Sequence, residues 1–182
     1  MASYVLVYLI EGKAKRYHQA LSKEISKKFN VKNPSDRIVP HITIKFIGNL
    51  NNKNQVKELI RKINETSFNL RKFEFTLEGF NNFDRRVLFI DVKKIDALQN
   101  AYQEVYSRII KLPFIKKVPK FEGKNMHFHA TLCIDDIEKK FDKIKNYLSN
   151  RNPVYEVYFN NLALMKKENN ERWKPIKIWR IK

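Results

Sequence analysis

The stretch Pro40–Ile44 reads Pro-His-Ile-Thr-Ile, and 88 residues later Phe128–Leu132 reads Phe-His-Ala-Thr-Leu. In both stretches a histidine is followed two positions later by a threonine, with apolar residues around the pair. The chain has only four histidines and four threonines. Random placement gives about 0.1 such pairs, so two copies are informative where one would be weak. The two stretches therefore indicate a repeated feature of the fold.

Both stretches have the apolar composition of β-strands. Residues i and i+2 of a strand share a face, so His41 and Thr43 point in one direction, and His129 and Thr131 do the same. Near its reference pKa of about 6.5, histidine serves as proton donor or acceptor. Two imidazoles flanking a phosphate act as general base and general acid, while hydroxyls bind its non-bridging oxygens.

The pattern thus predicts His41 and His129 as catalytic and Thr43 and Thr131 as phosphate-binding. It leaves open which histidine is the acid. The competing interpretation is a pair of core histidines beside β-forming threonines.

Hydrophobic periodicity predicts four helices and eight strands along the chain. The helical stretches are Leu21–Phe29, Val56–Ile63, Ile95–Ile109 and Ile137–Leu148. The strand stretches are Tyr4–Ile10, Ile38–Ile47, Phe73–Leu77, Val87–Val92, Met126–Ile134, Val154–Phe159, Leu162–Met165 and Ile176–Ile181.

The order helix, motif strand, helix occurs twice. This repeat predicts one α+β domain over residues 1–182, with two pseudo-symmetric lobes built around the motif strands 40–47 and 126–134. Each lobe is expected to have a mainly antiparallel sheet with flanking helices. The active-site cleft is expected between the lobes.

The composition favours a soluble protein that meets a polyanion. Lysine and arginine number 37 against 19 acidic residues, and the net charge of +18 would attract RNA or an oligonucleotide. AT-rich coding is an alternative source of this lysine bias. No apolar run approaches the ~20 residues that cross a bilayer, and the start of the chain lacks a signal-peptide pattern. With the single Cys133 excluding an internal disulfide, we expect a cytoplasmic monomer without cofactor or membrane partner.

Six further residues are candidates for substrate contact: Lys45, His127, Tyr4, Tyr8, Phe83 and Phe121. Lys45 is two positions beyond Thr43 on the same strand, and the aromatic residues are placed to flank the cleft or stack a base. Aromatic residues are more often part of a core, which is the alternative for each. The segment 111–126 interleaves lysines with aromatic residues, and it either guides a single strand or is a solvated loop.

Two other histidines need an interpretation. His127 and His129 share a strand face, so together with His41 they suggest zinc as an alternative. No carboxylate stands at comparable spacing, and we therefore expect no metal. His18 falls one turn before Leu21 on the first helix, and we expect it to be structural.

The paired His-x-Thr strands resemble those of the two-histidine (2H) phosphoesterase superfamily, which includes 2'-5' RNA ligase (LigT-like) RNA cyclic phosphodiesterases. The resemblance extends over essentially the whole chain, with weaker likenesses at Arg86–Phe89 and Leu162–Met165. The chain departs from the family at Asp135, where LigT-like members often have an arginine, and at Lys166-Lys167, where a serine is more usual.

The resemblance implies metal-independent hydrolysis of 2',3'-cyclic phosphate ends of RNA to 2'-phosphates, or cleavage of 2'-5' phosphodiester bonds. Two alternatives stay open. One is a non-catalytic nucleotide- or RNA-binding module with the same cleft. The other is a 3'-5' RNA end-trimming phosphodiesterase that uses the same histidines and makes the cyclic product.

Overall fold

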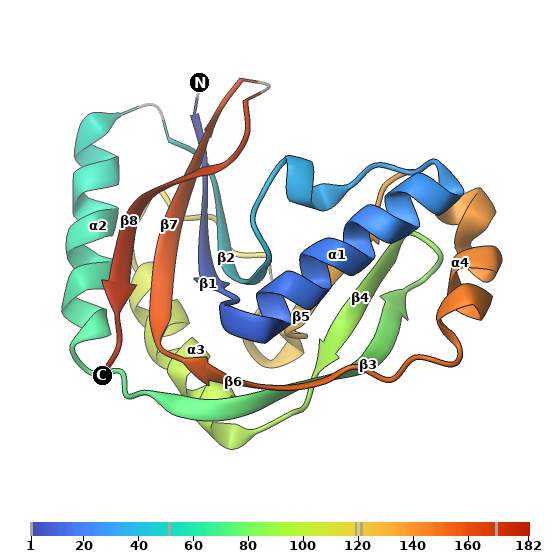
Figure 1. Ribbon diagram of the computed structural model, residues 1–182. Helices are drawn as coiled ribbons and strands as arrows, with labels where there is room; N and C mark the ends of the chain where they lie inside the picture. The colour runs from blue at the N-terminus through green and yellow to red at the C-terminus, as the bar shows by residue number, and fades with distance from the viewer. Residues whose placement is uncertain (1, 51, 119, 121, 170) are drawn as a thin grey trace.

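The computed structural model describes residues 2–50, 52–118, 120, 122–169 and 171–182, which form an α+β fold as predicted (Figure 1). The helices are α1 (Gly12–Phe29), α2 (Lys53–Ser67), α3 (Asp96–Ile109) and α4 (Phe141–Leu148). The strands are β1 (Ala2–Leu9), β2 (His41–Leu50), β3 (Phe73–Phe83), β4 (Val87–Val92), β5 (His129–Ile134), β6 (Val154–Phe159), β7 (Asn161–Glu168) and β8 (Lys174–Arg180). No described helix is long and apolar enough to span a membrane.

The strands form two four-stranded antiparallel sheets, with the orders β2-β1-β7-β8 and β5-β4-β3-β6. Each sheet has one motif strand, and in both sheets that strand lies at an edge. The two edges meet, because β2 and β5 contact each other. One His-x-Thr pair therefore enters the space between the sheets from each side.

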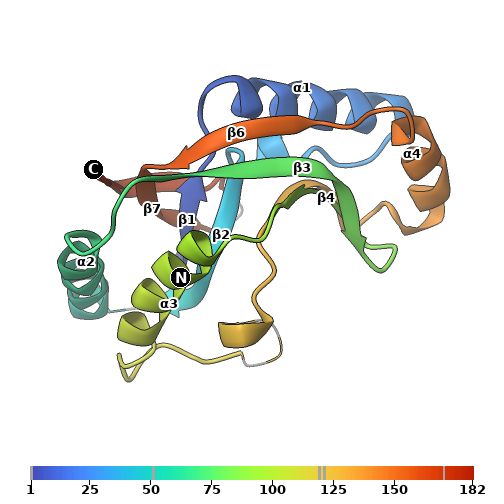
Figure 2. The same cartoon turned by 90° about the horizontal axis from the view of Figure 1, so that it is seen from below.

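Two helices cross from one sheet to the other. α1 follows β1 of the first sheet but packs against β5 and β6 of the second, and α3 follows β4 of the second sheet but contacts β2 and α2. Both views show α2 and α3 on one side of the molecule and α1 and α4 on the other (Figures 1 and 2). Each sheet is therefore partly covered by a helix that follows a strand of the other sheet. This exchange of helices holds the two lobes together.

The buried stripe of α1 explains how this helix holds the second motif strand. Its buried residues are Ala14, His18, Leu21, Ser22 and Ile25, at the spacing of one helical face. Ser22 Oγ donates a buried hydrogen bond of 2.7 Å to the carbonyl of Leu132 in β5. The polar members of the stripe thus bind strand backbone.

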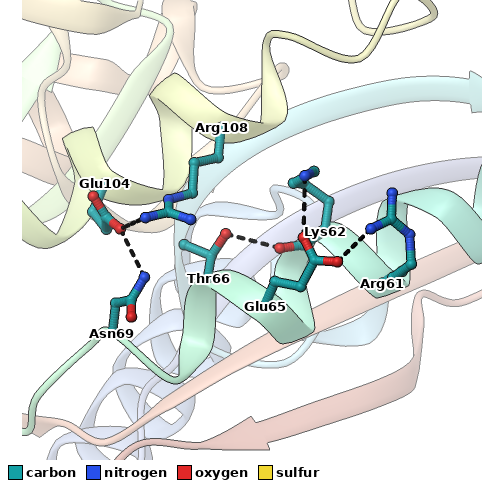
Figure 3. Close-up of polar contacts among 7 residues, drawn as sticks. All are labelled: Arg61, Lys62, Glu65, Thr66, Asn69, Glu104 and Arg108. Carbon is teal, nitrogen blue, oxygen red and sulfur yellow. Dashed lines mark hydrogen bonds and ion pairs between the residues drawn. The ribbon is translucent and has the colours of Figure 1, made fainter.

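Helices α2 and α3 contact each other, and polar residues of both helices make contacts in this region (Figure 3). Beyond the end of α2, Asn69 donates a hydrogen bond of 3.3 Å to Glu104 of α3, and the same carboxylate pairs with Arg108 at 2.7 Å. Pairs at the surface contribute roughly 0–1 kcal/mol. Leu59 of α2 and Leu98 of α3 are both buried in the hydrophobic core, and this burial stabilises each helix more than the surface pairs do.

One hydrophobic core joins the two sheets. Tyr8 of β1 contacts Phe75 of β3 and Phe159 of β6, with ring centroids 5.4 Å and 5.7 Å apart. Tyr8 is 2% exposed and Tyr4 is 5% exposed, so neither flanks the cleft as the sequence suggested. The reason is strand alternation, which directs residues 4, 6 and 8 into the shared core.

Candidate active site

A bulge in β2 sets which side chains face the cleft. His41 pairs with Leu9 and Thr43 with Val7, but a register shift between Leu6 and Val7 leaves Ile44 as an extra residue. Beyond the bulge the alternation is reversed. Phe46 continues the face of the motif side chains, and Lys45 turns to the core face.

Lys45 consequently lies 1% exposed, in contrast to its expected place beside a phosphate. Its ammonium donates to the carbonyl of Lys116 at 2.8 Å and forms an ion pair with the buried carboxylate of Glu122. Glu122 in turn accepts a hydrogen bond of 3.0 Å from the backbone N–H of Val118. The charge of Lys45 is thus neutralised within the protein, where it holds Lys116 and Glu122 against β2.

The motif histidines are anchored in the same way in both lobes. His41 Nδ1 is 2.8 Å from the carbonyl of Val39, and His129 Nδ1 is 2.8 Å from the carbonyl of His127. A carbonyl only accepts, so each Nδ1 has the proton and donates it. In the neutral rings each Nε2 is then a free acceptor, without a hydrogen-bond partner among the described residues.

Burial lowers the pKa of both imidazoles below their ordinary value. For His41, the hydrogen bond to Val39 opposes this effect, and the neighbouring His129 lowers the pKa further. For His129, the bond to His127 and the charge of Asp91 oppose the effect of burial. Because both pKa values lie below 6.5, both rings are neutral at pH 7. Both remain partly exposed, so they are accessible to a ligand.

All four motif residues line one cavity of about 310 Å³. Because His18 also lines it, we call it the three-histidine cavity; its lining residues are His18, Pro34, Ser35, Ile38, Val39, Pro40, His41, Thr43, His129, Thr131 and Ile134. The structure therefore brings the two His-x-Thr pairs together. Two imidazoles and two hydroxyls on one cavity are the groups needed to bind a phosphodiester and move its protons.

Comparison with known proteins assigns the chain to a family. The family model described as the 2'-5' RNA ligase superfamily matches residues 13–171, which include both motif strands. The chain belongs to the 2'-5' RNA ligase superfamily. Among curated proteins, no sequence matches significantly.

Several solved structures have the same fold as this protein, although their sequences are only 12–13% identical to it. E. coli LigT complexed with 3'-AMP superimposes with a TM-score of 0.64 at 13% identity, covering 98% of this chain and 97% of LigT. A crystal structure of a phosphoesterase gives 0.63 at 13% identity over 100% and 99% of the two chains. Kluyveromyces marxianus Usb1 gives 0.52 at 12% identity over 96% and 97%. E. coli LigT has also been solved with ATP and with NADP+.

A second, larger cavity of about 720 Å³ adjoins the three-histidine cavity. We call it the aromatic cavity; its lining residues are Thr43, Ile44, Lys45, Phe46, Phe83, Val118, Lys120, Glu122, Asn125, Met126, His127 and His129. Thr43 and His129 line both cavities, so the two meet at the motif residues. Phe46 is 56% exposed and Phe83 is 37% exposed, which leaves faces of both rings open to a ligand.

Phe83 also packs against the second motif strand. Its ring meets His129 edge-on at 4.9 Å and His127 at 5.3 Å. His127 Nε2 donates to Asp91 Oδ1 at 2.8 Å, and Asp91 is the cross-strand partner of His129. His127 therefore lines the aromatic cavity and supports His129 through its carbonyl. Phe121 lies outside the described residues.

The described residues include no group of three or more histidine, cysteine, aspartate or glutamate side chains placed to hold a metal ion. The carboxylate of Asp91 accepts a hydrogen bond from His127, but these two residues do not form part of such a metal-binding group. At the departure from the family pattern, Asp135 faces the guanidinium of Arg37 at 4.0 Å, which offsets its negative charge.

Sequence reasoning missed Phe46, Asp91 and the place of His18 beside the motif pair. Nothing in the order of residues signals the bulge that exposes Phe46. Asp91 lies near the end of β4, and only the sheet order makes it a neighbour of His129. His18 was expected to be structural, and its position in the wall of the cavity depends on the crossing of α1 to the second sheet.

We predict that Lys45→Met destabilises the fold and acts on catalysis only through that loss. Removal of one partner from a buried ion pair typically costs about 3–5 kcal/mol, because the other charge stays buried and unpaired. The free energy of unfolding in urea measures this effect.

The double variant Lys45→Met, Glu122→Gln is the matched control. It removes the orphaned charge while keeping an acceptor for Val118, and it should regain most of the lost stability. A Lys45→Met protein as stable as the wild type, with turnover abolished, would contradict the structural role of Lys45.

Proposed function

We propose that this protein is a metal-independent phosphoesterase of RNA ends, which hydrolyses 2',3'-cyclic phosphates to 2'-phosphates or cleaves 2'-5' phosphodiester bonds. The observation that carries the proposal is the matched anchoring of His41 and His129, which leaves two Nε2 atoms free on one cavity. Membership of a superfamily of phosphoesterases supports it.

The chemistry needs two proton transfers, and the two imidazoles supply them. One neutral Nε2 takes a proton from water as the water oxygen bonds to phosphorus. The bond from phosphorus to the 3' oxygen breaks, and that oxygen takes a proton from the other, protonated ring. The ring that gained a proton then releases it to solvent, and the ring that lost one takes a proton from solvent. Both rings thereby return to their starting states. No electron transfer or metal is required.

Charge builds up on the non-bridging oxygens during this step. The hydroxyls of Thr43 and Thr131 share strand faces with the two imidazoles and lie on the same cavity, where they are placed to donate to these oxygens. Each preorganised donor of this kind contributes typically 10²–10³-fold to the rate.

The aromatic cavity suits the base of the terminal nucleotide. A base that enters beside Phe46 and Phe83 would stack on sequence-tolerant ring faces while its phosphate reaches Thr43 and His129. The ion pair of Lys45 and Glu122 on this wall is neutral overall, so Lys45 offers no unpaired charge to a second phosphate. The net charge of +18 favours approach of a polyanion from any side.

We predict that His41→Ala and His129→Ala each lower kcat on a 2',3'-cyclic phosphate oligonucleotide by about 10²–10⁴-fold, because each removes one proton-transfer partner. Both rings are partly exposed and bonded only to a backbone carbonyl, so the variants should fold. His127→Gln, which keeps a donor for Asp91, is the control and should lose less than about tenfold. Steady-state rates in EDTA measure all three.

The same assay separates the alternatives. Products sorted into 2'- and 3'-phosphates give the regiochemistry, and a 2'-5' linked oligoadenylate tests the second reaction. Loss of wild-type activity in EDTA would replace the proposal with metal catalysis. Tight RNA binding without product would favour the binding module, and cyclic ends formed from linear RNA would favour end trimming.

We predict that kcat/KM follows a bell-shaped pH profile with its maximum below the ordinary histidine pKa of about 6.5. The active form has one neutral and one protonated imidazole. Since burial lowers both pKa values, the acid loses its proton as pH rises towards 6.5, and the rate falls. The two limbs report the pair together, because the rings are coupled.

The kcat profile should lie at higher pH than the kcat/KM profile, because bound phosphate favours the charged imidazole. Initial rates from pH 4 to 9 at constant ionic strength measure both. A kcat/KM maximum above pH 8, or a single titration, would contradict acid–base catalysis by this pair.

A further inference from the structure

Two buried side-chain atoms of the described residues have no hydrogen-bond partner: His18 Nδ1 and Ser35 Oγ. They come from different parts of the chain, α1 and the turn at residues 34–36. Both residues line the three-histidine cavity. Buried polar atoms without a partner are costly and rare, so two on one cavity point to a bound group.

The ring of His18 is fixed as a hydrogen-bond acceptor on the cavity side. His18 is 3% exposed, and its Nε2 donates to the carbonyl of Thr131 at 2.8 Å. Since that nitrogen has the proton, Nδ1 has a lone pair. Burial lowers the pKa of His18 to about 4, with the bond to Thr131 opposing it and His41 adding to it, so the ring stays neutral at pH 7.

Ser35 is held firmly while its hydroxyl stays unused. Its backbone N–H donates to Asn33 Oδ1 at 3.1 Å, and its carbonyl accepts from Arg172 at 2.7 Å. Its Oγ both donates and accepts. The neighbouring wall of the cavity is apolar, with Ile38 and Pro34 among its residues, and offers no competing side-chain partner.

We propose that His18 Nδ1 and Ser35 Oγ form a subsite for an O–H group beside the reacting phosphate. A lone pair at Nδ1 repels a phosphate oxygen but accepts from a hydroxyl, so the subsite discriminates between the two. The subsite rests on the proposed function. Its occupant is either the attacking water or the 2'-hydroxyl of the nucleotide that precedes the cyclic phosphate.

The water case adds one contact to the reaction already described. One O–H of the water donates a hydrogen bond to His18 Nδ1 and keeps its proton, while the other proton passes to the catalytic imidazole that acts as base. The water oxygen bonds to phosphorus as the 3' oxygen leaves. In the hydroxyl case no bond changes at the subsite, and the contact selects RNA over DNA at the preceding sugar.

Ser35→Ala is the sharpest test, because it removes Oγ without breaking a hydrogen bond within the described protein. His18→Gln is the second variant, since its amide keeps a donor for Thr131 but has no acceptor at the position of Nδ1. Ser149→Ala, at an exposed position after α4, is the matched control. The substrates are two dinucleotides that end in a 2',3'-cyclic phosphate, one with ribose and one with deoxyribose in the preceding nucleotide.

Each of the two variants should lower kcat/KM on the ribose substrate by about 3–10-fold, the size expected from one lost hydrogen bond, while Ser149→Ala equals the wild type. If the occupant is water, kcat falls equally on both substrates with KM unchanged. If it is the 2'-hydroxyl, KM rises on the ribose substrate alone, and the wild-type preference for ribose disappears.

Wild-type kinetics in Ser35→Ala and His18→Gln, with normal thermal unfolding, would overturn the subsite and leave the proposed function standing. Absence of turnover by the wild type on both substrates would instead refute the proposed function, and the subsite with it.

Discussion

A backbone carbonyl that can only accept a hydrogen bond decides what each motif histidine does. The carbonyls of Val39 and His127 accept hydrogen bonds from Nδ1 of His41 and His129, both at 2.8 Å. Without these bonds either ring nitrogen would hold the proton, and the rings would turn about their side-chain torsions. With them, each ring has one orientation and one tautomer, and presents Nε2 to the cavity. Two strands of different sequence thus arrive at the same arrangement.

That arrangement is useful only if the two edge strands stay opposed. The crossed helices supply this constraint. Helix α1 follows β1, which pairs with β2, and Ser22 of α1 donates a hydrogen bond to the backbone of β5. The shared core adds to it through Tyr8, which packs on strands of the other sheet. The lobes are therefore not free halves that close on a substrate. The gap between the imidazoles is set by the packing of the whole chain.

The elements and the motif pair were predictable from sequence, because both depend on local periodicity. The eight strands and four helices follow from alternation and helical spacing, and the expectation that the two His-x-Thr pairs share one site follows from residue type. The bulge at Ile44 was not predictable, since it depends on pairing with β1. That one extra residue exchanges the expected places of Lys45 and Phe46. Tyr4 and Tyr8 were misplaced because the sequence does not say which face of β1 meets the second sheet.

The central claim is that both imidazoles reach one phosphorus, and a structure with a uridine–vanadate complex tests it most directly. This complex mimics the five-coordinate phosphorus of cyclic phosphate hydrolysis. The account predicts vanadate oxygens within about 2.6–3.2 Å of Nε2 of both His41 and His129, on opposite sides of the metal centre. Vanadate bound to one imidazole alone, or elsewhere on the protein, would contradict it.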